Sequence, residues 1–373
     1  MPTLNLNGFS FPELQSVDGL KKLDTVFLTF LNEQDKALHQ FLLDYRNKRL
    51  SLISKDISQC LIEVARQIEI FLSQFYGIGE AVNALQLKTI QFDPIYLFKK
   101  EFVLKRAKRQ LKKTQDHSLY PALTEKLIAT IKKNTVEPDL ELAFAQYALK
   151  QLTENNETEI EAITLWCILS IKQPTDIMKN WISFKIPKKI DFQRLIAVSE
   201  GFRKHVSSAS FEQRDGFDLT DQRMSMKQVQ NEVHYCVYCH KTDGDFCAKG
   251  FPVKKGKPEQ GLKINPLGET LTGCPLDEKI SEMHVLKKNG YAIGALATVM
   301  IDNPMCPATG HRICNDCMKG CIYQKQEPVN IPQIETKTLT DVLELPWGVE
   351  IYDLLTRWNP LRCDQFCAKP YNG

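Results

Sequence analysis

The sequence CPATGHRICNDCMKGC, residues 306–321, places four cysteines within one short stretch of the chain. Cys314 and Cys317 are separated by two residues, and Cys321 follows after three more. Thiols at this density in a reducing compartment are rarely paired as disulfides and are better suited to bind a soft metal ion or a cluster. The stretch therefore predicts that this part of the chain folds around metal-bound thiolates.

Cysteines on the N-terminal side of this stretch extend the pattern. Of the 12 cysteines in the chain, eight lie between residues 236 and 321: Cys236, Cys239, Cys247, Cys274, Cys306, Cys314, Cys317 and Cys321. This count suits two four-iron clusters, and it would also suit two four-cysteine zinc sites. A single zinc site built from the two CxxC pairs would leave the other four thiols unexplained, which favours clusters.

The first CxxC pair also matches another motif. Cys236-Val-Tyr-Cys239-His240 has the spacing of the attachment site for c-type haem. That chemistry normally takes place on exported chains, and Met1–Asn7 lacks the basic start and apolar stretch of a signal peptide. Because haem attachment would leave the neighbouring cysteines without a role, we prefer a cluster or zinc.

The first 200 or so residues are predicted to be a series of helices. Apolar side chains recur at three- and four-residue steps in two stripes, Leu23 to Tyr45 and Ile53 to Phe75. Cys60 lies on the second stripe and Cys167 in a later apolar run, so both are expected to be buried as small hydrophobic side chains. The basic segment 99–113 has enough apolar positions to dock on a core.

Composition restricts the remaining possibilities. The chain has 373 residues, 43% of them apolar and 25% charged, with a net charge of +3. We therefore expect a globular protein in the cytoplasm, without a membrane span and without nucleic acid as a partner. The predicted class is all-α, with a helical domain of unknown role at 1–205, a linker at 206–230 and an iron–sulfur domain at 231–373.

The cysteine region resembles a known family. The stretch from Cys236 to Glu335 is similar to the N-terminal double-cluster domain of the glutamate synthase small-subunit family, which dihydropyrimidine dehydrogenase and related flavin-dependent NAD(P)H oxidoreductases share. The resemblance implies an α-helical ferredoxin fold with two [4Fe–4S] clusters. It covers roughly a quarter of the chain and is carried by five segments in order: Tyr235–Cys239, Gly273–Leu276 with Ile280–Met283, Thr309–Cys314, Cys317–Cys321 and Glu327–Glu335.

The same resemblance implies the ligands of each cluster. The first cluster would be held by Cys236, Cys239, Cys247 and Cys321. The second would be held by Cys274, Cys314, Cys317 and an oxygen of Glu335. This chain departs from the family pattern in three places. Cys274 follows an inserted stretch rich in lysine and glycine, the spacing between Cys314 and Cys317 is shorter than usual, and the spare thiol of Cys306 could replace Glu335 or one neighbouring ligand. His311 and Arg312 are expected either to hydrogen-bond to a cluster or to cap a turn.

The resemblance further implies electron transfer between a flavin domain and a partner. No glycine fingerprint for FAD or NAD(P)H is expected in residues 1–373, so these cofactors would belong to a separate flavoprotein subunit or to a missing C-terminal region. We expect part of an NAD(P)H-dependent oxidoreductase that is not catalytically complete alone, with no catalytic acid, base or nucleophile. The alternative is a zinc-stapled interaction module without redox activity, with the basic segment 99–113 as its partner surface.

Overall fold

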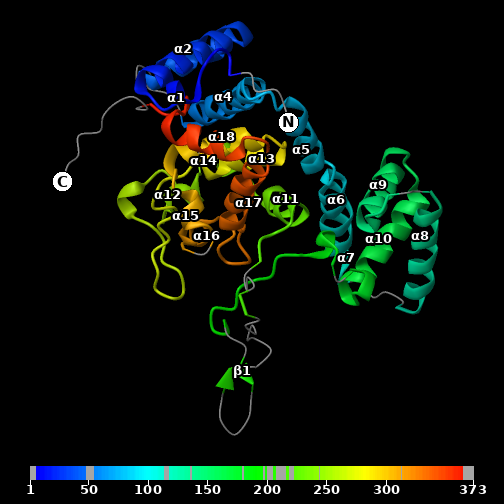
Figure 1. Cartoon of the computed structure of the whole chain (residues 1–373). Coiled ribbons are helices and arrows are strands. Elements are labelled where there is room, and N and C mark those ends of the chain that lie inside the picture. The colour runs from blue at the N-terminus through cyan, green and yellow to red at the C-terminus, as the bar shows by residue number, and fades with distance from the viewer. Residues whose placement is uncertain are drawn as a thin grey trace. The chain divides into compact units, whose positions relative to one another are not determined.

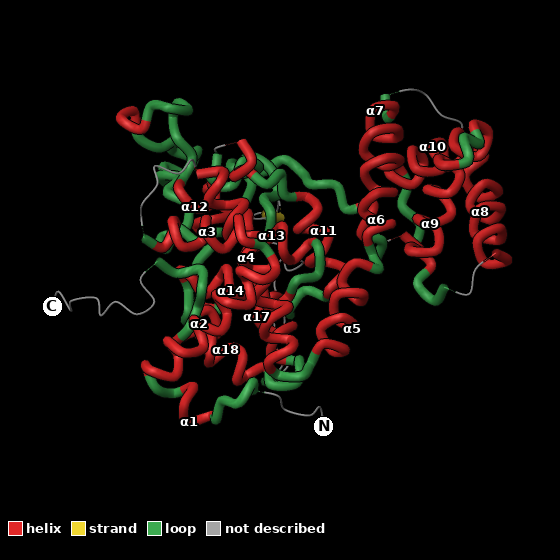
Figure 2. The backbone as a smooth tube through the Cα atoms, turned by 90° about the horizontal axis from the view of Figure 1, so that it is seen from above, coloured by secondary structure: helices red, strands yellow, loops and turns green. Residues whose placement is uncertain are grey.

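The computed structural model describes residues 6–47, 54–112, 117–134, 137–178, 180–195, 198–199, 205–206, 216–217, 222–242, 244–311 and 313–363. These residues are almost entirely helical or in loops, which confirms the predicted all-α class (Figure 2). A short antiparallel pair joins strands β1 (Val198–Ser199) and β2 (His205–Val206). Within the ranges that the structure describes, no helix has the length and apolar character needed to span a bilayer.

The chain forms two compact units, which Figure 1 allows the reader to follow by colour. Unit 1 combines Met1–Leu87 with Lys188–Gly373, and unit 2 is Lys88–Pro187. This division differs from the expected boundary near residue 205. The reason is that the apolar stripes of the first helices are buried against the cysteine region in one shared core, whereas the helices of unit 2 have a core of their own.

The helices of unit 1 come from both ends of the sequence. The N-terminal part supplies α1 (Phe11–Leu14), α2 (Val17–Gln34), α3 (Lys36–Arg46), α4 (Ser54–Phe75) and most of α5 (Gly79–Ile90). The C-terminal part supplies α11 (Met226–Tyr235), η6 (Cys239–Thr242), α12 (Phe246–Lys249), η7 (Pro258–Gln260), α13 (Ile280–Lys288), α14 (Ala292–Asp302), α15 (Cys306–Thr309), α16 (Asp316–Gly320), α17 (Ile331–Leu343) and α18 (Gly348–Arg357).

Helix α14 is the centre of unit 1. It contacts α4, α13, α17 and α18, and every residue from Ala292 to Met300 is buried. A helix that is apolar on all sides is stable only when other elements surround it. The crossing with α4 is close at Gly294, because a Cβ atom there would lie 2.6 Å from the carbonyl oxygen of Ala65. The carboxylate of Glu69 on α4 accepts hydrogen bonds from the backbone N–H groups of Ile293 and Gly294 at the start of α14.

The first helix of the cysteine region begins before the expected domain boundary at residue 231. Helix α11 begins at Met226, inside the expected linker, because Ser225 and Gln228 form a capping box in which each side chain accepts from the other residue's backbone N–H. Helix α13 begins at Ile280, so Cys274 lies in the loop before it. The helix ends before Gly290, which has a φ of +79°.

Unit 2 is a small helical unit with an aromatic core. Its elements are α6 (Asp93–Phe98), η1 (Lys99–Ala107), α7 (Lys108–Gln110), η2 (His117–Leu119), α8 (Tyr120–Asn134), α9 (Leu140–Thr153), α10 (Glu157–Lys172), η3 (Asp176–Met178) and η4 (Ile182–Phe184). Trp166 stacks on Phe144 with ring centroids 4.3 Å apart. The pair lies in the core, which also buries Cys167 as expected.

The basic segment 99–113 docks on the core of unit 2 as its apolar positions predicted. Phe102 and Val103 are buried, and residues Lys99–Ala107 form a π-helix. Lys99 is buried, and its ammonium donates to the carbonyl oxygens of Ile182 and Lys185. One end of the segment therefore serves the fold of unit 2 rather than a partner surface.

Candidate metal centre

Four cysteines line one small cavity in unit 1. They are Cys236, Cys239, Cys247 and Cys321, which we call the first cysteine group. The rest of the lining is mostly apolar and includes Ile322, Val329 and Ile331, together with Ser281 and His284. The four thiols that the resemblance assigned to one cluster therefore surround the same enclosed space, although they come from distant positions in the sequence.

Helix ends and tight turns position these four thiols. Cys236 caps the C-terminus of α11, and Cys321 caps the C-terminus of α16. Between Cys236 and Cys239 the chain reverses through Tyr238, whose φ of +52° is unusual for a residue with a side chain. The backbone N–H of Tyr238 lies 3.4 Å from the Cys236 sulfur. Cys247 lies on the short helix α12.

The thiols of the first group are strongly affected by burial. Burial raises the pKa of Cys236 to about 12 and that of Cys239 to about 11. It also raises the pKa of Cys247 and Cys321, and the other thiols of the group contribute to the rise at Cys247. Backbone N–H groups of Tyr323, Val329 and Ile322 act in the opposite direction at Cys321. Four neighbouring thiolates would therefore need a positive centre in the cavity to stay ionised.

His284 on α13 also lines this cavity. Its side chain is 1% exposed, and neither ring nitrogen has a hydrogen-bond partner. Burial, and next the neighbouring His240, lowers the pKa of His284 to about 3, so the ring is neutral at pH 7. Ser281, one turn earlier on α13, lies on the same side of the helix, and its hydroxyl is 2.5 Å from Nδ1 of His240.

A second cysteine group lies beside the first. Cys317 on α16 is buried and lies near enough to Cys274 and Cys314 for their charges to act on it, whereas Cys314 is exposed and its sulfur is 3.5 Å from a carboxylate oxygen of Asp316. Burial raises the pKa of Cys317 well above its usual value. Cys306 at the start of α15 is buried, and its pKa is raised to about 12 by burial and then by Glu335.

Two carboxyl groups accompany the second cysteine group. Glu335 on α17 was expected there from the resemblance, whereas Glu278 was not. The two side chains share a hydrogen bond, and Asn303 donates to Glu335 at 3.0 Å. Burial raises the pKa of Glu335 to about 8 and that of Glu278 to about 7. Both carboxyls act on Cys306 and on Cys317, so these two thiols flank the same acidic pair.

The two cysteine groups are joined by close backbone contacts. The backbone N–H of Cys274 donates to the carbonyl oxygen of Cys247 at 2.8 Å. Helices α12 and α16 lie side by side (Figure 1). At Gly320 a Cβ atom would lie 2.7 Å from the Phe246 carbonyl oxygen and 3.0 Å from the Gly273 Cα atom. Since α16 carries Cys317 and ends at Cys321, this packing fixes both groups relative to each other.

Over the residues that the structure describes, no three or more His, Cys, Asp or Glu side chains converge closely enough to hold one metal ion. A mononuclear zinc site needs four ligand atoms at about 2.0–2.3 Å from one point. The first cysteine group lines a cavity.

The remaining cysteines are placed separately. Cys60 is buried in the core of unit 1, as predicted, and burial raises its pKa to about 12. The sulfur of Cys363 is 3.7 Å from the carbonyl oxygen of Tyr45, and the residue is half-buried. Cys367 lies outside the described residues.

The two residues proposed to tune a cluster from beside Cys314 have different outcomes. Nδ1 of His311 lies 3.2 Å from the hydroxyl of Thr336, which ties the ring to α17. Arg312 lies outside the described residues, so its role stays a prediction. The histidine that lines the cavity of the first cysteine group is His284. His284 belongs to none of the motifs found in the sequence, so sequence reasoning did not predict it.

A second pocket, of about 370 Å³, lies behind the loop that connects Cys239 and Cys247. We call it the lysine pocket, since four of its lining residues are Lys249, Lys254, Lys255 and Lys257. The loop itself forms one wall through His240, Gly244, Asp245 and Phe246.

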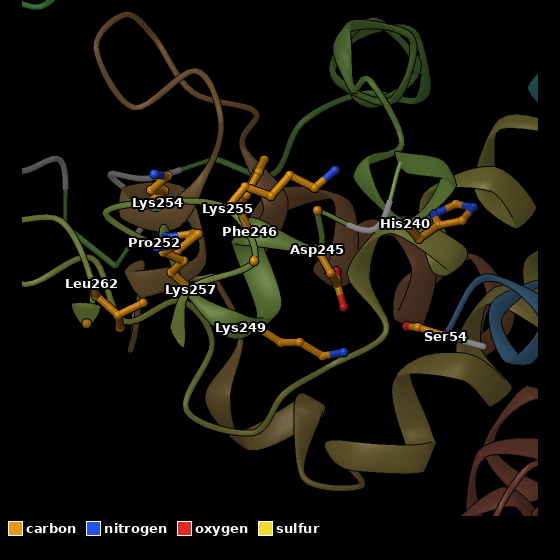
Figure 3. A pocket seen from close by; sticks show the side chains of 14 residues that line it. Ser54, His240, Asp245, Phe246, Lys249, Pro252, Lys254, Lys255, Lys257 and Leu262 are labelled. Carbon is orange, nitrogen blue, oxygen red and sulfur yellow. The ribbon is translucent and has the colours of Figure 1, made fainter. Parts of the chain in front are cut away.

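The inserted stretch after Cys247 forms the opposite wall of the lysine pocket. Figure 3 shows Lys254 and Lys257 on the loop of this insertion, with Asp245 and Lys249 between that loop and His240. Gly256 and Gly261 have open space where a Cβ atom would lie. The pocket therefore combines several positive side chains with approachable backbone next to the first cysteine group.

These observations define an all-helical chain with a four-thiol cavity and a second thiol and carboxyl cluster beside it. Residues 4–77 match the family described as the RP005 N-terminal alpha-helical domain. The chain is 32% identical over 292 residues to the uncharacterized protein RP005 of Rickettsia prowazekii (strain Madrid E), covering 74% of this chain and 96% of that protein. The chain therefore belongs to the RP005 family.

A shorter match links the chain to a second relative. Over 57 residues it is 72% identical to the uncharacterized protein RP006 of the same organism, which is 15% of this chain and 8% of that protein's length. No solved structure matches the chain. The family match at 4–77 covers α1 to α4, the helices that share a core with the cysteine region. The resemblance to the glutamate synthase small-subunit family stays a prediction.

Proposed function

We propose that this chain holds two [4Fe–4S] clusters and serves as the electron-transfer portion of a flavin-dependent NAD(P)H oxidoreductase. The observation that carries the proposal is the single cavity lined by Cys236, Cys239, Cys247 and Cys321. Clusters of this kind supply one-electron transfer, with a potential set by hydrogen bonds to sulfur and by solvent exposure. FAD and NAD(P)H would be bound by a flavoprotein partner or by a further region of the enzyme, so the chain alone is not catalytically complete.

The residues of the first cysteine group fit this role. Four thiols provide the ligands that a four-iron cluster takes from protein. Val329 and Ile331 in the lining are buried apolar side chains, and backbone N–H groups near Cys321 are aimed at its sulfur. Neither ring nitrogen of His284 has a hydrogen-bond partner, so this side chain can still form a hydrogen bond to a group bound in the cavity.

The second cysteine group would hold the second cluster. Cys274, Cys314 and Cys317 supply three thiolates, and the fourth position goes to Cys306 or to an oxygen of Glu335. The contact between the Cys274 N–H and the Cys247 carbonyl oxygen makes the two sites neighbours. Neighbouring sites suit electron transfer along a path. Thiols this numerous also suit a reducing compartment, so we place the protein in the cytoplasm.

Anaerobic purification tests this proposal. We expect a brown protein with the iron and acid-labile sulfide of two clusters, and an EPR signal after reduction by dithionite. A Cys236→Ser/Cys321→Ser variant should lose the content of one cluster, whereas the matched Cys60→Ser variant should keep both. A colourless protein with stoichiometric zinc would instead support a zinc-stapled interaction module and overturn the redox function.

We further propose that the partner docks on the lysine pocket with an acidic surface. The wall of this pocket is the loop between two ligands of the first cluster site, so a partner held there would lie near that site. Lys249, Lys254 and Lys257 contribute positive charge against the single acid Asp245 of the lining. Complementary charge of this kind accelerates the encounter of two proteins and makes it sensitive to salt.

Small oxidants of opposite charge test the sign of this surface. The Lys254→Gln/Lys257→Gln variant should oxidise severalfold more slowly with ferricyanide at low ionic strength, because the positive field that attracts the anion is weakened. Cationic hexaammineruthenium(III) should react as fast as before or faster. The control is Lys22→Gln on α2, which does not line the pocket. An electrostatic docking surface would be contradicted if the wild type, the double variant and the control all reacted with ferricyanide at one rate, and if all three also reacted with hexaammineruthenium(III) at one rate.

A further inference from the structure

His284 is a polar side chain that is buried without a hydrogen-bond partner, which is energetically unfavourable. It is 1% exposed, and both of its ring nitrogens lack a hydrogen-bond partner. A buried polar group that is left unsatisfied is unfavourable and uncommon in folded proteins. Side chains of Met283 and Leu286 on the same helix face the core, so a leucine at position 284 would be the simpler choice for packing alone.

The cavity supplies the missing partner. His284 lines the same cavity as Cys236, Cys239, Cys247 and Cys321. A neutral imidazole carries one N–H donor and one acceptor nitrogen. Thiolate and sulfide sulfur accept hydrogen bonds, so the sulfur atoms gathered in this cavity are acceptors within the space that the ring borders.

We propose that His284 donates a hydrogen bond to a sulfur atom of the cluster held by the first cysteine group and thereby raises the reduction potential of that cluster. This inference rests on the proposed function and adds a positioning residue to it. A donor to sulfur stabilises the reduced form, which carries more negative charge, and so makes reduction more favourable. His240 and Ser281 would hold the neighbouring part of α13 in place, because the Ser281 hydroxyl is 2.5 Å from Nδ1 of His240.

Redox titration of the full chain, monitored by EPR, tests this role. We expect the His284→Leu variant to keep the iron and sulfide of two clusters while one midpoint potential falls and the other is unchanged. His284→Gln retains an N–H donor, so its potential should lie between those of the wild type and His284→Leu. The matched control is Met283→Leu, a neighbour on α13 that is buried but does not line the cavity. Its two potentials should equal those of the wild type.

A second measurement uses the wild-type protein and does not depend on how a variant folds. Protein labelled with ¹⁵N-histidine should show hyperfine coupling of one exchangeable proton and one histidine nitrogen to the reduced first cluster. The inference is wrong if this coupling is absent, or if His284→Leu and Met283→Leu leave the same potentials. In either case the proposed function would stand as long as both clusters are present. A wild-type chain without iron and sulfide would overturn the proposed function itself.

Discussion

At the scale of single residues, the fourth ligand of the proposed second cluster is either Cys306 or Glu335. The Glu335 carboxyl is already engaged by Asn303 and Glu278, whereas the Cys306 sulfur has a contact with the Met300 sulfur at 4.0 Å. Thiolate is also a softer ligand for iron than carboxylate. We therefore expect Cys306→Ser to change the EPR signal of one cluster or remove its iron, and Glu335→Gln to keep both. The reverse pattern would show an oxygen ligand from Glu335.

Glu69 provides a pH-dependent contribution to stability that is independent of any metal. Burial raises the pKa of Glu69 in the folded protein from an ordinary 4.5 to about 7. The hydrogen bonds from the backbone N–H groups of Gly294 and Ile293 and the charge of Lys287 lower the pKa, but burial has the larger effect. A carboxyl with a raised pKa binds its proton more tightly in the folded state, so its effect on stability becomes less favourable as pH rises from 4.5 to 7 and is constant above. The shift corresponds to about 3 kcal/mol.

The Glu69→Gln variant isolates this contribution. Glutamine keeps an oxygen that accepts from Ile293 but has no proton to titrate. We expect the free energy of unfolding of the wild type to fall by about 3 kcal/mol more than that of the variant between pH 4.5 and 7, measured by urea denaturation. Parallel pH profiles of the two proteins would show that Glu69 has an ordinary pKa in the folded state.

Several site residues could be predicted from the sequence and others could not. Two pairs of cysteines separated by two residues predicted metal-binding turns, Cys236 with Cys239 and Cys314 with Cys317. This spacing is a local feature, so it can be recognised in the sequence without the fold. Glu278 carried no such signal, since a glutamate before a helix is common on any surface. His284 was missed for the same reason: it stands between apolar positions of α13, and only the three-dimensional cavity shows which way its side chain faces.

At the scale of elements, Gly320 controls the distance between α12 and α16. An alanine there would place its Cβ 2.7 Å from the Phe246 carbonyl oxygen and 3.0 Å from Gly273 Cα, and neither backbone atom can move freely. We expect Gly320→Ala to destabilise the fold by about 1–3 kcal/mol, as overpacking does, and to reduce iron binding at both sites. Thermal unfolding and iron analysis measure the two effects.

A Gly79→Ala variant serves as the control, because it tests the effect of replacing a glycine by alanine at a position without a steric clash. Gly79 begins α5, has an ordinary φ and has open space where the methyl group of an alanine would lie, so Gly79→Ala should be neutral or stabilising by about 0.4–1 kcal/mol. It should leave the iron content unchanged. If Gly320→Ala behaves like Gly79→Ala, the close approach of α12 and α16 is not required for the metal sites.

At the scale of the whole molecule, the helical periodicity gave the class of the fold but not its division into units. Phe27 and Leu31 were expected to lie on an apolar stripe, and both are buried. That stripe packs with Leu296 and Leu354, which lie more than two hundred residues away in the chain. Such long-range packing leaves no local pattern, so a boundary based on the polar stretch near residue 205 separated helices that share a core.

The two separate cores lead to a prediction about how the chain unfolds. Trp166 is fully buried in unit 2, where it stacks on Phe144 and donates to the Thr124 hydroxyl. Trp166→Ala should destabilise unit 2 by about 3–5 kcal/mol, and Trp166→Phe by less, because a large aromatic side chain leaves a cavity when it is truncated. Since no residue of this core belongs to the core of unit 1, the iron and sulfide content should not change.

Circular dichroism and visible absorption, followed together during heating, distinguish the two cores. In the alanine variant we expect part of the helical signal to be lost at a lower temperature while the cluster absorption keeps its wild-type midpoint, so that the transition is no longer two-state. If the cluster absorption is lost at the same lowered temperature, then the units unfold cooperatively. In that case the stability of the metal centre would depend on residues 88–187 as well as on the helices that surround it.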